Sequence, residues 1–545
     1  MRVTWRKLPP GPYEVGWEPA LVAPAADGSP LLTDHYFPCG GEDFPTLMVR
    51  SPYGRGNPWA ALYGILFAEQ GFHVVVQSCR GTAGSGGAFQ PWRDEAADGQ
   101  AAVAWLRQQP WFNGALGTIG PSYLGYVQWA LALEPPPELR AMVVQVGLHD
   151  PYAFFHAGGA LHLENALVSG VGMAYLHRGT VPFLRAALRL RRWLRGAHRL
   201  RAPYAPSQPD MSGPADELPW LAEALARKDD SDPYWHGVSV GAAAERSTVP
   251  TCLIGGWQDV FLDQNIEQYR RLRHAGGEST LLIGPWTHAS AFQRGWPEVF
   301  AESLAWLRAQ LCGERHGLRS TGVRVHVGGD SGGEWRDLAD WPPAAPSSEG
   351  RWYLASGGRL GRQAPERGAD PVAEFRYDLA DPTPAVGGPA LSQGAGRRNN
   401  RALEAREDVL TFTGPVLDEP LEVLGAVAAR LRMTGEWARG AEGGAAGGAA
   451  VGRAFDVFAR LCDVDERGRS VNVCDGLVRV RDRDGAEPLE VVVPMSATAR
   501  RFAAGHRVRL QVSGGAYPRF APPGGAGDGG ALRVALYPAS VLELP

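Results

Sequence analysis

The first 150 residues alternate short apolar runs with segments of helical spacing. The apolar runs at 46–50, 72–77 and 141–146 have the length of strands, and the last two are rich in β-branched residues, as strands buried on both faces are. Helical segments at 59–70 and 95–108 separate them. Strands that alternate with helices predict an α/β fold with a mostly parallel sheet, in which active sites form at the carboxyl ends of the strands.

The alternation stops at about residue 150 and resumes at about residue 249. Residues 151–240 have helical spacing and many aromatic and arginine side chains, and an amphipathic basic helix is predicted over 184–200. An insertion of this size between sheet strands predicts a helical cap over the active site. Its arginine face is interpreted as a solvated surface, in preference to an anion-binding one.

Further strands are predicted at 249–259, 279–284 and 322–328, and the pattern changes again beyond about residue 345. From there, short alternating segments are broken by Gly and Pro and no helices are predicted. Such segments lie at 409–412, 424–433, 455–464 and 507–513. This spacing predicts an all-β sandwich or jelly roll, with the Gly/Ala tract at 440–452 as a loop between strands.

The composition excludes several classes of partner. The chain has 545 residues, a net charge of −4, 44% hydrophobic and 21% charged residues, which is typical of a soluble protein of two to three domains without a nucleic-acid or membrane-surface partner. The N-terminus lacks the apolar region of a signal peptide, and no run is long enough to span a membrane. We therefore expect a cytoplasmic protein.

The six cysteines predict neither a metal site nor a redox motif, because no C-x-x-C pair occurs among them. Cys462 and Cys474 fall on segments that could be facing strands. We interpret them as free buried thiols rather than as a disulfide.

The stretch from Gly117 to Gly125 predicts a catalytic nucleophile. A β-branched strand ends at Gly120-Pro121-Ser122, and a helical segment over 126–133 follows without a polar loop. A serine on so tight a turn has its hydroxyl exposed above the sheet, with a helix N-terminus behind it that favours developing negative charge. The usual elbow is G-x-S-x-G, whereas the second glycine here comes one place later. An ordinary Gly-rich strand–helix turn is the alternative.

Ser122, Asp259 and His288 each follow a predicted strand, in the chain order of the α/β-hydrolase triad. A serine hydroxyl is a poor nucleophile until an imidazole accepts its proton, and a carboxylate fixes the tautomer of that imidazole. Taken singly, His288 could be a hydrogen-bonded core histidine and Asp259 a loop cap. Their joint occurrence at strand ends predicts a catalytic triad.

Several motifs together resemble those of the cocaine esterase family (CocE/NonD hydrolases), which is related to X-prolyl dipeptidyl-peptidases and α-amino-acid ester hydrolases. Residues 120–125 resemble its G-x-S-Y-x-G motif, and Arg50-Ser51-Pro52-Tyr53 its R-x-P-Y motif. Gly256-Trp257-Gln258-Asp259 matches G-W-x-D, and residues 284–288 match G-P-W-[ST]-H. Residues 377–382 resemble Y-D-P-x-D-P, with Leu379 in place of the first proline.

The resemblance implies roles for further residues. The Tyr53 hydroxyl and the Tyr123 backbone N–H would form the oxyanion hole, and Phe261 would line the acyl pocket. Trp257, from the same motif as Asp259, is expected to bind substrate. Neither a cofactor nor a metal is implied. The resemblance also implies an α/β-hydrolase domain (1–150 and 241–345) with a helical cap (151–240), followed by a C-terminal jelly roll (346–545).

We therefore expect a serine hydrolase of a small-molecule ester or amide, with an acyl esterase as the first choice. An X-prolyl dipeptidyl-peptidase or a cephalosporin-type acylase is the alternative, because both use the same triad. The residues after Asp259 are apolar where a bound amino group would need a carboxylate, which Asp263, Glu267 or Glu164 could still supply. A carbohydrate-binding protein without catalysis is a third interpretation. The natural substrate and the oligomeric state do not follow from the sequence.

Overall fold

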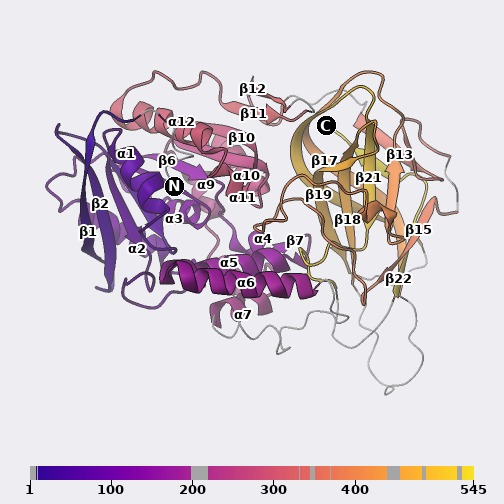
Figure 1. Ribbon diagram of the computed structural model, residues 1–545, viewed down its shortest axis with the longest axis horizontal. Coiled ribbons are helices and arrows are strands. Elements are labelled where there is room, and N and C mark those ends of the chain that lie inside the picture. The colour runs from indigo at the N-terminus through magenta and orange to yellow at the C-terminus, as the bar shows by residue number, and fades with distance from the viewer. Residues whose placement is uncertain are drawn as a thin grey trace, which may run out of the picture.

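The computed structural model describes residues 8, 10–197, 219–329, 332–343, 350–366, 368, 370–437, 454–481, 487–523 and 531–545. The Gly/Ala tract at 440–452 lies outside these residues. The described chain forms an α/β part and an all-β part that lie side by side, with helices of the insertion beneath both (Figure 1).

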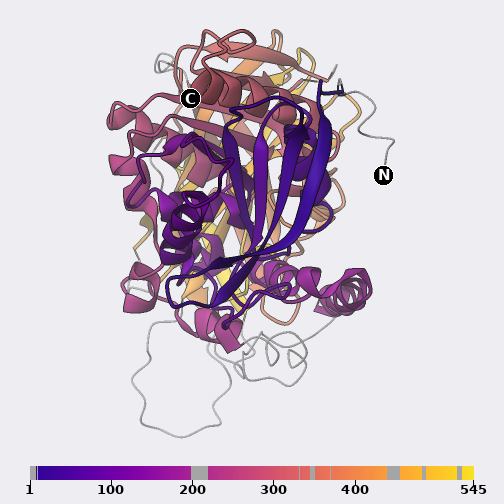
Figure 2. The same cartoon turned by 90° about the vertical axis from the view of Figure 1, so that its left-hand side faces the viewer.

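The α/β part is built on one ten-stranded sheet, whose β1–β4 side faces the viewer in Figure 2. The strands lie in the order β1-β2-β4-β3-β5-β6-β9-β10-β11-β12, parallel from β4 to β11 and antiparallel at both ends. Their bounds are β1 (Glu14–Pro24), β2 (Pro30–Cys39), β3 (Thr46–Ser51), β4 (His73–Ser78), β5 (Leu116–Pro121), β6 (Leu139–Gln145), β9 (Thr251–Gln258), β10 (Ser279–Thr287), β11 (Val323–Val327) and β12 (Glu334–Leu338).

Helices cover both faces of this sheet, because successive strand residues are apolar and point to opposite sides. Val144 and Leu253 pack with α2 (Glu95–Leu106), α3 (Tyr123–Leu131) and α10 (Leu262–His274). Val143 and Ile254 pack on the other face with the π-helix η2 (Ala60–Ile65), α1 (Leu66–Ala68) and α12 (Trp296–Leu307). The helix predicted over 59–70 is thus a π-helical segment followed by a short α-helix. A second π-helix, η5 (Arg308–Cys312), follows α12.

The insertion leaves the sheet after β6 and returns at β9, its neighbour. It contains α4 (Pro151–Phe155), β7 (His156–Ala157), β8 (Ala160–Leu161), α5 (Leu163–Tyr175), η3 (Leu176–Arg178), α6 (Thr180–Ala197), α7 (Pro219–Ala226), α8 (Pro233–His236) and α9 (Gly241–Arg246). Leu163, Leu167 and Leu190 pack against Tyr517 and Ala521 of the all-β part. The insertion therefore bridges the two parts, as α5 and α6 show in Figure 1.

The all-β part has an apolar core of its own, to which the long antiparallel pair β17 and β20 contributes. Its strands are β13 (Arg351–Ala355), β14 (Arg359–Gly361), β15 (Ala373–Asp378), β16 (Val409–Thr413), β17 (Leu421–Trp437), β18 (Phe455–Val464), β19 (Ser470–Val480), β20 (Leu489–Phe502), β21 (Arg507–Ser513), β22 (Ala531–Leu536) and β23 (Val541–Glu543), with the short helix η7 (Leu403–Ala405) before β16. The predicted α/β part and C-terminal all-β part are confirmed. The domain boundary at 345/346 stays a prediction.

Two predictions about single features have definite outcomes. Cys462 and Cys474 lie on the paired strands β18 and β19, and both are free and buried, as predicted. Arg185, Arg189, Arg191 and Arg192 of α6 are exposed. Among the described residues, no helix has both the length and the apolarity needed to cross a bilayer.

Candidate active site

Ser122 joins β5 directly to α3 with a strained backbone. Its φ and ψ are 57° and −121°, a conformation that L-residues rarely adopt. The Ser122 N–H donates to the carbonyls of Gln145 and Val146 on the neighbouring strand, so the turn is fixed to the sheet. The helix begins at Tyr123, three residues earlier than predicted. The Tyr123 N–H is therefore in the first turn of α3, where an N–H has no carbonyl partner within the helix.

The displaced second glycine of this elbow has a steric explanation. Gly120 has a φ of 156°, and a Cβ added there would lie 2.5 Å from the Leu124 Cβ, so Leu124 occupies the space that a side chain at 120 would need. A Cβ added at Gly125 would lie 2.9 Å from the Gly147 Cα, at the end of β6. Gly125 therefore lets α3 pack closely on the neighbouring strand end.

Asp259 and His288 are brought together from the ends of two adjacent strands. Asp259 directly follows β9, and His288 is the first residue of α11 (His288–Ala291), which follows β10. The His288 Nδ1 lies 2.7 Å from the Asp259 Oδ2, and the Asp259 Oδ1 accepts the Phe261 N–H at 2.8 Å. The Asp259 side chain is fully buried. This carboxylate can fix the histidine tautomer and leaves Nε2 as the nitrogen able to accept a proton.

Tyr53 lies above the end of β3, with its hydroxyl hydrogen-bonded to the side chain of Ser122. Burial raises the pKa of Tyr53 to about 12, although the Ser122 hydrogen bond opposes the shift. The phenol is therefore a neutral donor at all ordinary pH values. Its ring stacks on Trp59 at a centroid distance of 5.9 Å, which fixes the direction of the hydroxyl.

The hydroxyl of Tyr123 is part of a buried polar network. This hydroxyl donates to the Glu95 Oε1 at 2.8 Å and accepts the Trp92 N–H at 2.9 Å. Glu95 in turn is paired with Arg50, whose Nη2 lies 3.0 Å from its Oε2. This network anchors the peptide that follows Ser122 to the start of α2. Sequence reasoning missed Glu95 and Trp92, because nothing in their spacing relates them to Ser122.

A cavity of about 610 Å³ contains Ser122 and His288 in its wall, together with Tyr53 and Tyr123. Most of the rest is apolar and comes from η2 and the residue before it, from the insertion, from Phe261, and from the residue after α11 (His288–Ala291): Trp59, Leu62, Phe154, Val168, Met173, Phe183 and Phe292. Phe261 packs edge-on against His288 at 5.4 Å and against Phe154 at 5.1 Å. The helical insertion therefore does form part of the wall around Ser122.

Trp257 does not line this cavity. Its indole N–H donates to the His326 carbonyl at 2.7 Å, its ring packs on Trp341, and it lines a second cavity instead. The three carboxylates considered for an amino group are also elsewhere, because none of Asp263, Glu267 and Glu164 lines the cavity of Ser122. Asp263 contacts Ser496 and Glu267 pairs with Arg271.

No group of three or more His, Cys, Asp and Glu side chains suited to a metal ion is found among the described residues. The arrangement at Ser122 is that of acyl transfer: a strained serine, a histidine held by a carboxylate, and two N–H or O–H donors beside the serine.

The comparisons with known proteins agree with this chemistry. Residues 27–290 match the model of the X-Pro dipeptidyl-peptidase (S15 family), and residues 316–529 match that of the X-Pro dipeptidyl-peptidase C-terminal non-catalytic domain. The cocaine esterase of Rhodococcus sp. (strain MB1 Bresler) is 29% identical over 92% of this chain and 91% of its own length.

The fold has solved counterparts that extend over the whole chain. An α-amino acid ester hydrolase has a TM-score of 0.76 at 19% identity, covering 99% of this chain and 97% of its own. A CocE/NonD family hydrolase from Staphylococcus aureus has a TM-score of 0.68 at 17% identity, with the same coverage. At this identity the likeness shows the fold alone.

The fold and the matching families define a serine hydrolase with a C-terminal non-catalytic domain. Residues 27–290 match the S15 family model and the cocaine esterase aligns with nearly the whole chain, so the resemblance predicted from the motifs is confirmed.

Proposed function

We propose that this protein is an acyl esterase in which Ser122 is the nucleophile, His288 the base and then acid, and Asp259 the orienting carboxylate. One observation carries the proposal: Ser122 and His288 line a single apolar cavity, with Asp259 bound to the far nitrogen of the imidazole. Oxygen nucleophiles in proteins need such a base, because the serine hydroxyl is not ionised at neutral pH.

In the first half-reaction the Ser122 Oγ attacks the ester carbonyl carbon and its proton passes to the His288 Nε2. The carbonyl oxygen becomes an oxyanion that accepts from the Tyr53 hydroxyl and the Tyr123 N–H. When the intermediate collapses, His288 returns the proton to the departing alcohol and the acyl group stays on Ser122. Water then attacks this acyl-enzyme, with His288 again as base, and releases the carboxylic acid.

The wall of the cavity favours an ester with an apolar acyl group over a dipeptide. A dipeptidyl-peptidase substrate carries a free α-amino group, whose charge needs a carboxylate when it is buried. Among the described residues that line the cavity, none is Asp or Glu. Phe261 and Phe154 supply instead a surface suited to an alkyl or aryl group.

The proposal can be tested by comparing the rates at which one preparation of the protein hydrolyses three kinds of substrate. These are aryl esters, alanyl-prolyl anilides and simple acyl anilides. We expect fast ester turnover, little or no cleavage of the dipeptidyl anilide, and loss of ester turnover in Ser122→Ala. Cleavage of the dipeptidyl anilide at a rate comparable to the ester would instead support the peptidase alternative, and an active Ser122→Ala variant would contradict the assigned nucleophile.

A further inference from the structure

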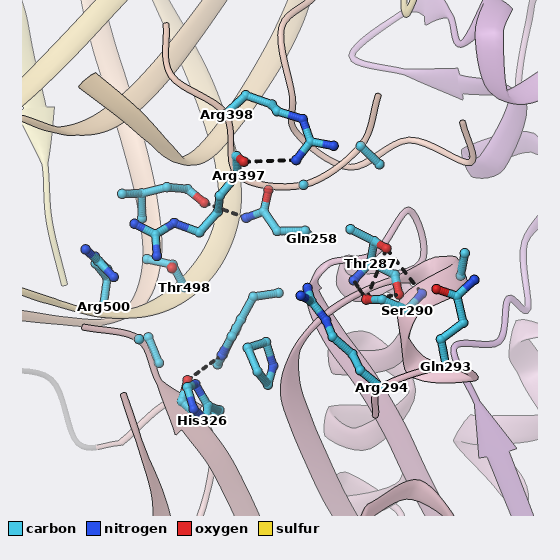
Figure 3. A pocket seen from close by; sticks show the side chains of 18 of the residues that line it. Gln258, Thr287, Ser290, Gln293, Arg294, His326, Arg397, Arg398, Thr498 and Arg500 are labelled. Carbon is cyan, nitrogen blue, oxygen red and sulfur yellow. Dashed lines mark hydrogen bonds between the residues drawn. The ribbon is translucent and has the colours of Figure 1, made fainter. Parts of the chain in front are cut away.

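A second cavity, of about 660 Å³, lies between the α/β part and the all-β part (Figure 3). One wall is the end of β10 and the segment after it, from Pro285 to Arg294. The opposite wall is the loop 392–398 together with β20. Four arginines line this space, which we term the arginine cavity: Arg294, Arg397, Arg398 and Arg500. Among the described residues around it there is no Asp or Glu.

Two of these arginines carry charges that no carboxylate of the described chain neutralises. Arg294 is exposed, extends towards the centre of the cavity in Figure 3, and has neither a hydrogen bond nor an ion pair with the described residues. Among the described residues, the Arg398 guanidinium donates only to backbone carbonyls, those of Arg397 and Gln393, both at 3.1 Å. Arg500 differs, because it is buried and paired with Asp463.

The surroundings of these charges suit an oxyanion. The Thr498 hydroxyl lies on the same walls and can donate a hydrogen bond, whereas the hydroxyls of Thr287 and Ser290 are engaged with each other in the capping box of α11. Guanidinium groups bind carboxylate and phosphate in a two-pronged geometry that gives both strength and direction. Since the chain as a whole has a net charge of −4, this concave basic site does not follow from a basic composition.

The arginine cavity adjoins the cavity of Ser122. Ala289 and Gln293 line both of them, and Ala289 directly follows His288. The space around Ser122 is apolar, whereas the space beyond α11 is cationic. A molecule that occupied both would have an apolar end at the serine and an anionic end at the arginines.

We propose that the arginine cavity binds a carboxylate or phosphate group at the alcohol end of the ester substrate. This inference rests on the proposed function. His288 protonates the departing alcohol, so the alcohol end of the substrate lies on the side of His288, where α11 leads from one cavity to the other. Substrates of this class have an apolar acyl group and an anionic alcohol.

Butyrate esters of ω-hydroxy carboxylic acids with one to five methylene groups test the inference, each compared with its neutral carboxamide. Binding to Ser122→Ala protein, measured by titration calorimetry at low salt, needs no turnover. We expect the carboxylate ester whose methylene chain has the optimal length to bind about tenfold more tightly than the matching carboxamide. One charge-assisted hydrogen bond would give a difference of this size. In the active protein the same ratio should appear in KM, with kcat little changed.

Arginine variants test whether Arg294 and Arg398 cause the tighter binding of the carboxylate. In the double variant Arg294→Gln/Arg398→Gln the acid-to-amide ratio should fall to about one, and Arg294→Lys should retain part of it because the charge remains. Arg376→Gln is the matched control, since Arg376 is an exposed arginine of β15 that lines neither cavity. It should keep the full preference.

The inference is overturned if the carboxylate and the carboxamide bind equally at every methylene-chain length. It is also overturned if the double variant still binds the carboxylate more tightly than the carboxamide. Rate changes caused by inorganic phosphate that depend on Arg294, without any acid preference, would also overturn it, because the cavity would then bind a free anion. If the esters bind but are not hydrolysed through Ser122, the proposed function fails instead. In that case the ratio of carboxylate to carboxamide affinity, measured by calorimetry, still tests whether the arginine cavity binds the anion.

Discussion

The carboxylate of Asp259 uses both of its oxygens, Oδ2 on His288 at 2.7 Å and Oδ1 on the Phe261 N–H at 2.8 Å. The second hydrogen bond holds the carboxylate in place, so that the first can hold the imidazole. Phe261 also packs edge-on against that ring. The loop after β9 therefore fixes the histidine from two directions, and it does so with a sequence of only three residues.

Replacement of Asp259 by Asn tests this arrangement. We expect the fold to persist and kcat for an aryl ester to fall by a factor on the order of 10⁴, because an amide favours the wrong imidazole tautomer. Asp465→Asn is a matched control, since Asp465 accepts backbone N–H groups in a turn of the all-β part. A fall of less than tenfold in Asp259→Asn would contradict the assigned role.

Tyr53→Phe isolates the proposed oxyanion donor. The ring can still stack on Trp59, while the hydroxyl that contacts Ser122 is lost. We expect kcat/KM to fall by about 10²–10³, the usual cost of removing one oxyanion donor. Tyr63→Phe is the control, because that buried hydroxyl donates to Gln145 and lies outside the cavity. It should lower stability and leave kcat/KM nearly unchanged; equal losses in both variants would argue against a catalytic role for Tyr53.

The buried pair of Arg50 and Glu95 should matter more to stability than an exposed pair would. Arg50→Met leaves the Glu95 carboxylate buried without a counter-charge, and we expect the free energy of unfolding to fall by about 3–5 kcal/mol. Arg50→Met/Glu95→Gln removes both charges and keeps an acceptor for Tyr123, so part of this loss should return. Urea denaturation measures both. A double variant less stable than Arg50→Met would contradict the account.

Stability should rise with pH between about 4 and 6 because of buried histidines. His149 is a clear case, since burial, aided by Arg271, lowers its pKa to about 3. Between that value and the pKa of about 6.5 in the unfolded chain, only the unfolded state binds the proton, so acidification favours unfolding. His149→Gln should reduce the slope of unfolding free energy against pH by about 1.4 kcal/mol per unit near pH 5. An unchanged slope would show that His149 is already protonated in the folded protein.

Much of the fold follows from local patterns in the sequence. Strands such as β18 and β21 have the predicted bounds. The predicted helical segment over 59–70 is present, but spacing along the chain did not distinguish its π-helical part, η2, from an α-helix. Tertiary packing of Tyr63 and Phe67 against Trp296 and Phe300 governs that segment, and spacing along the chain does not contain those contacts.

The candidate site was predictable where it depends on strand ends, and less so where it depends on packing. Ser122, Asp259 and His288 could be selected because each follows a strand of one parallel sheet. Trp257 was expected at the substrate from its place beside Asp259. Trp257 lines the arginine cavity instead, with its indole N–H bound to the His326 carbonyl, a contact between distant segments. The roles of Glu95 and Arg294 depend on contacts between distant segments, which no local motif specifies.

If Ser122 is the nucleophile, the acyl group of the substrate is transferred to its hydroxyl during turnover. Mass spectrometry of protein quenched during turnover of a slowly deacylated aryl ester detects such an acyl-enzyme. We expect a mass increase equal to the acyl group, located on the peptide that contains Ser122 and missing from Ser122→Ala. An adduct on another residue, or full ester hydrolysis by Ser122→Ala, would contradict this role of Ser122.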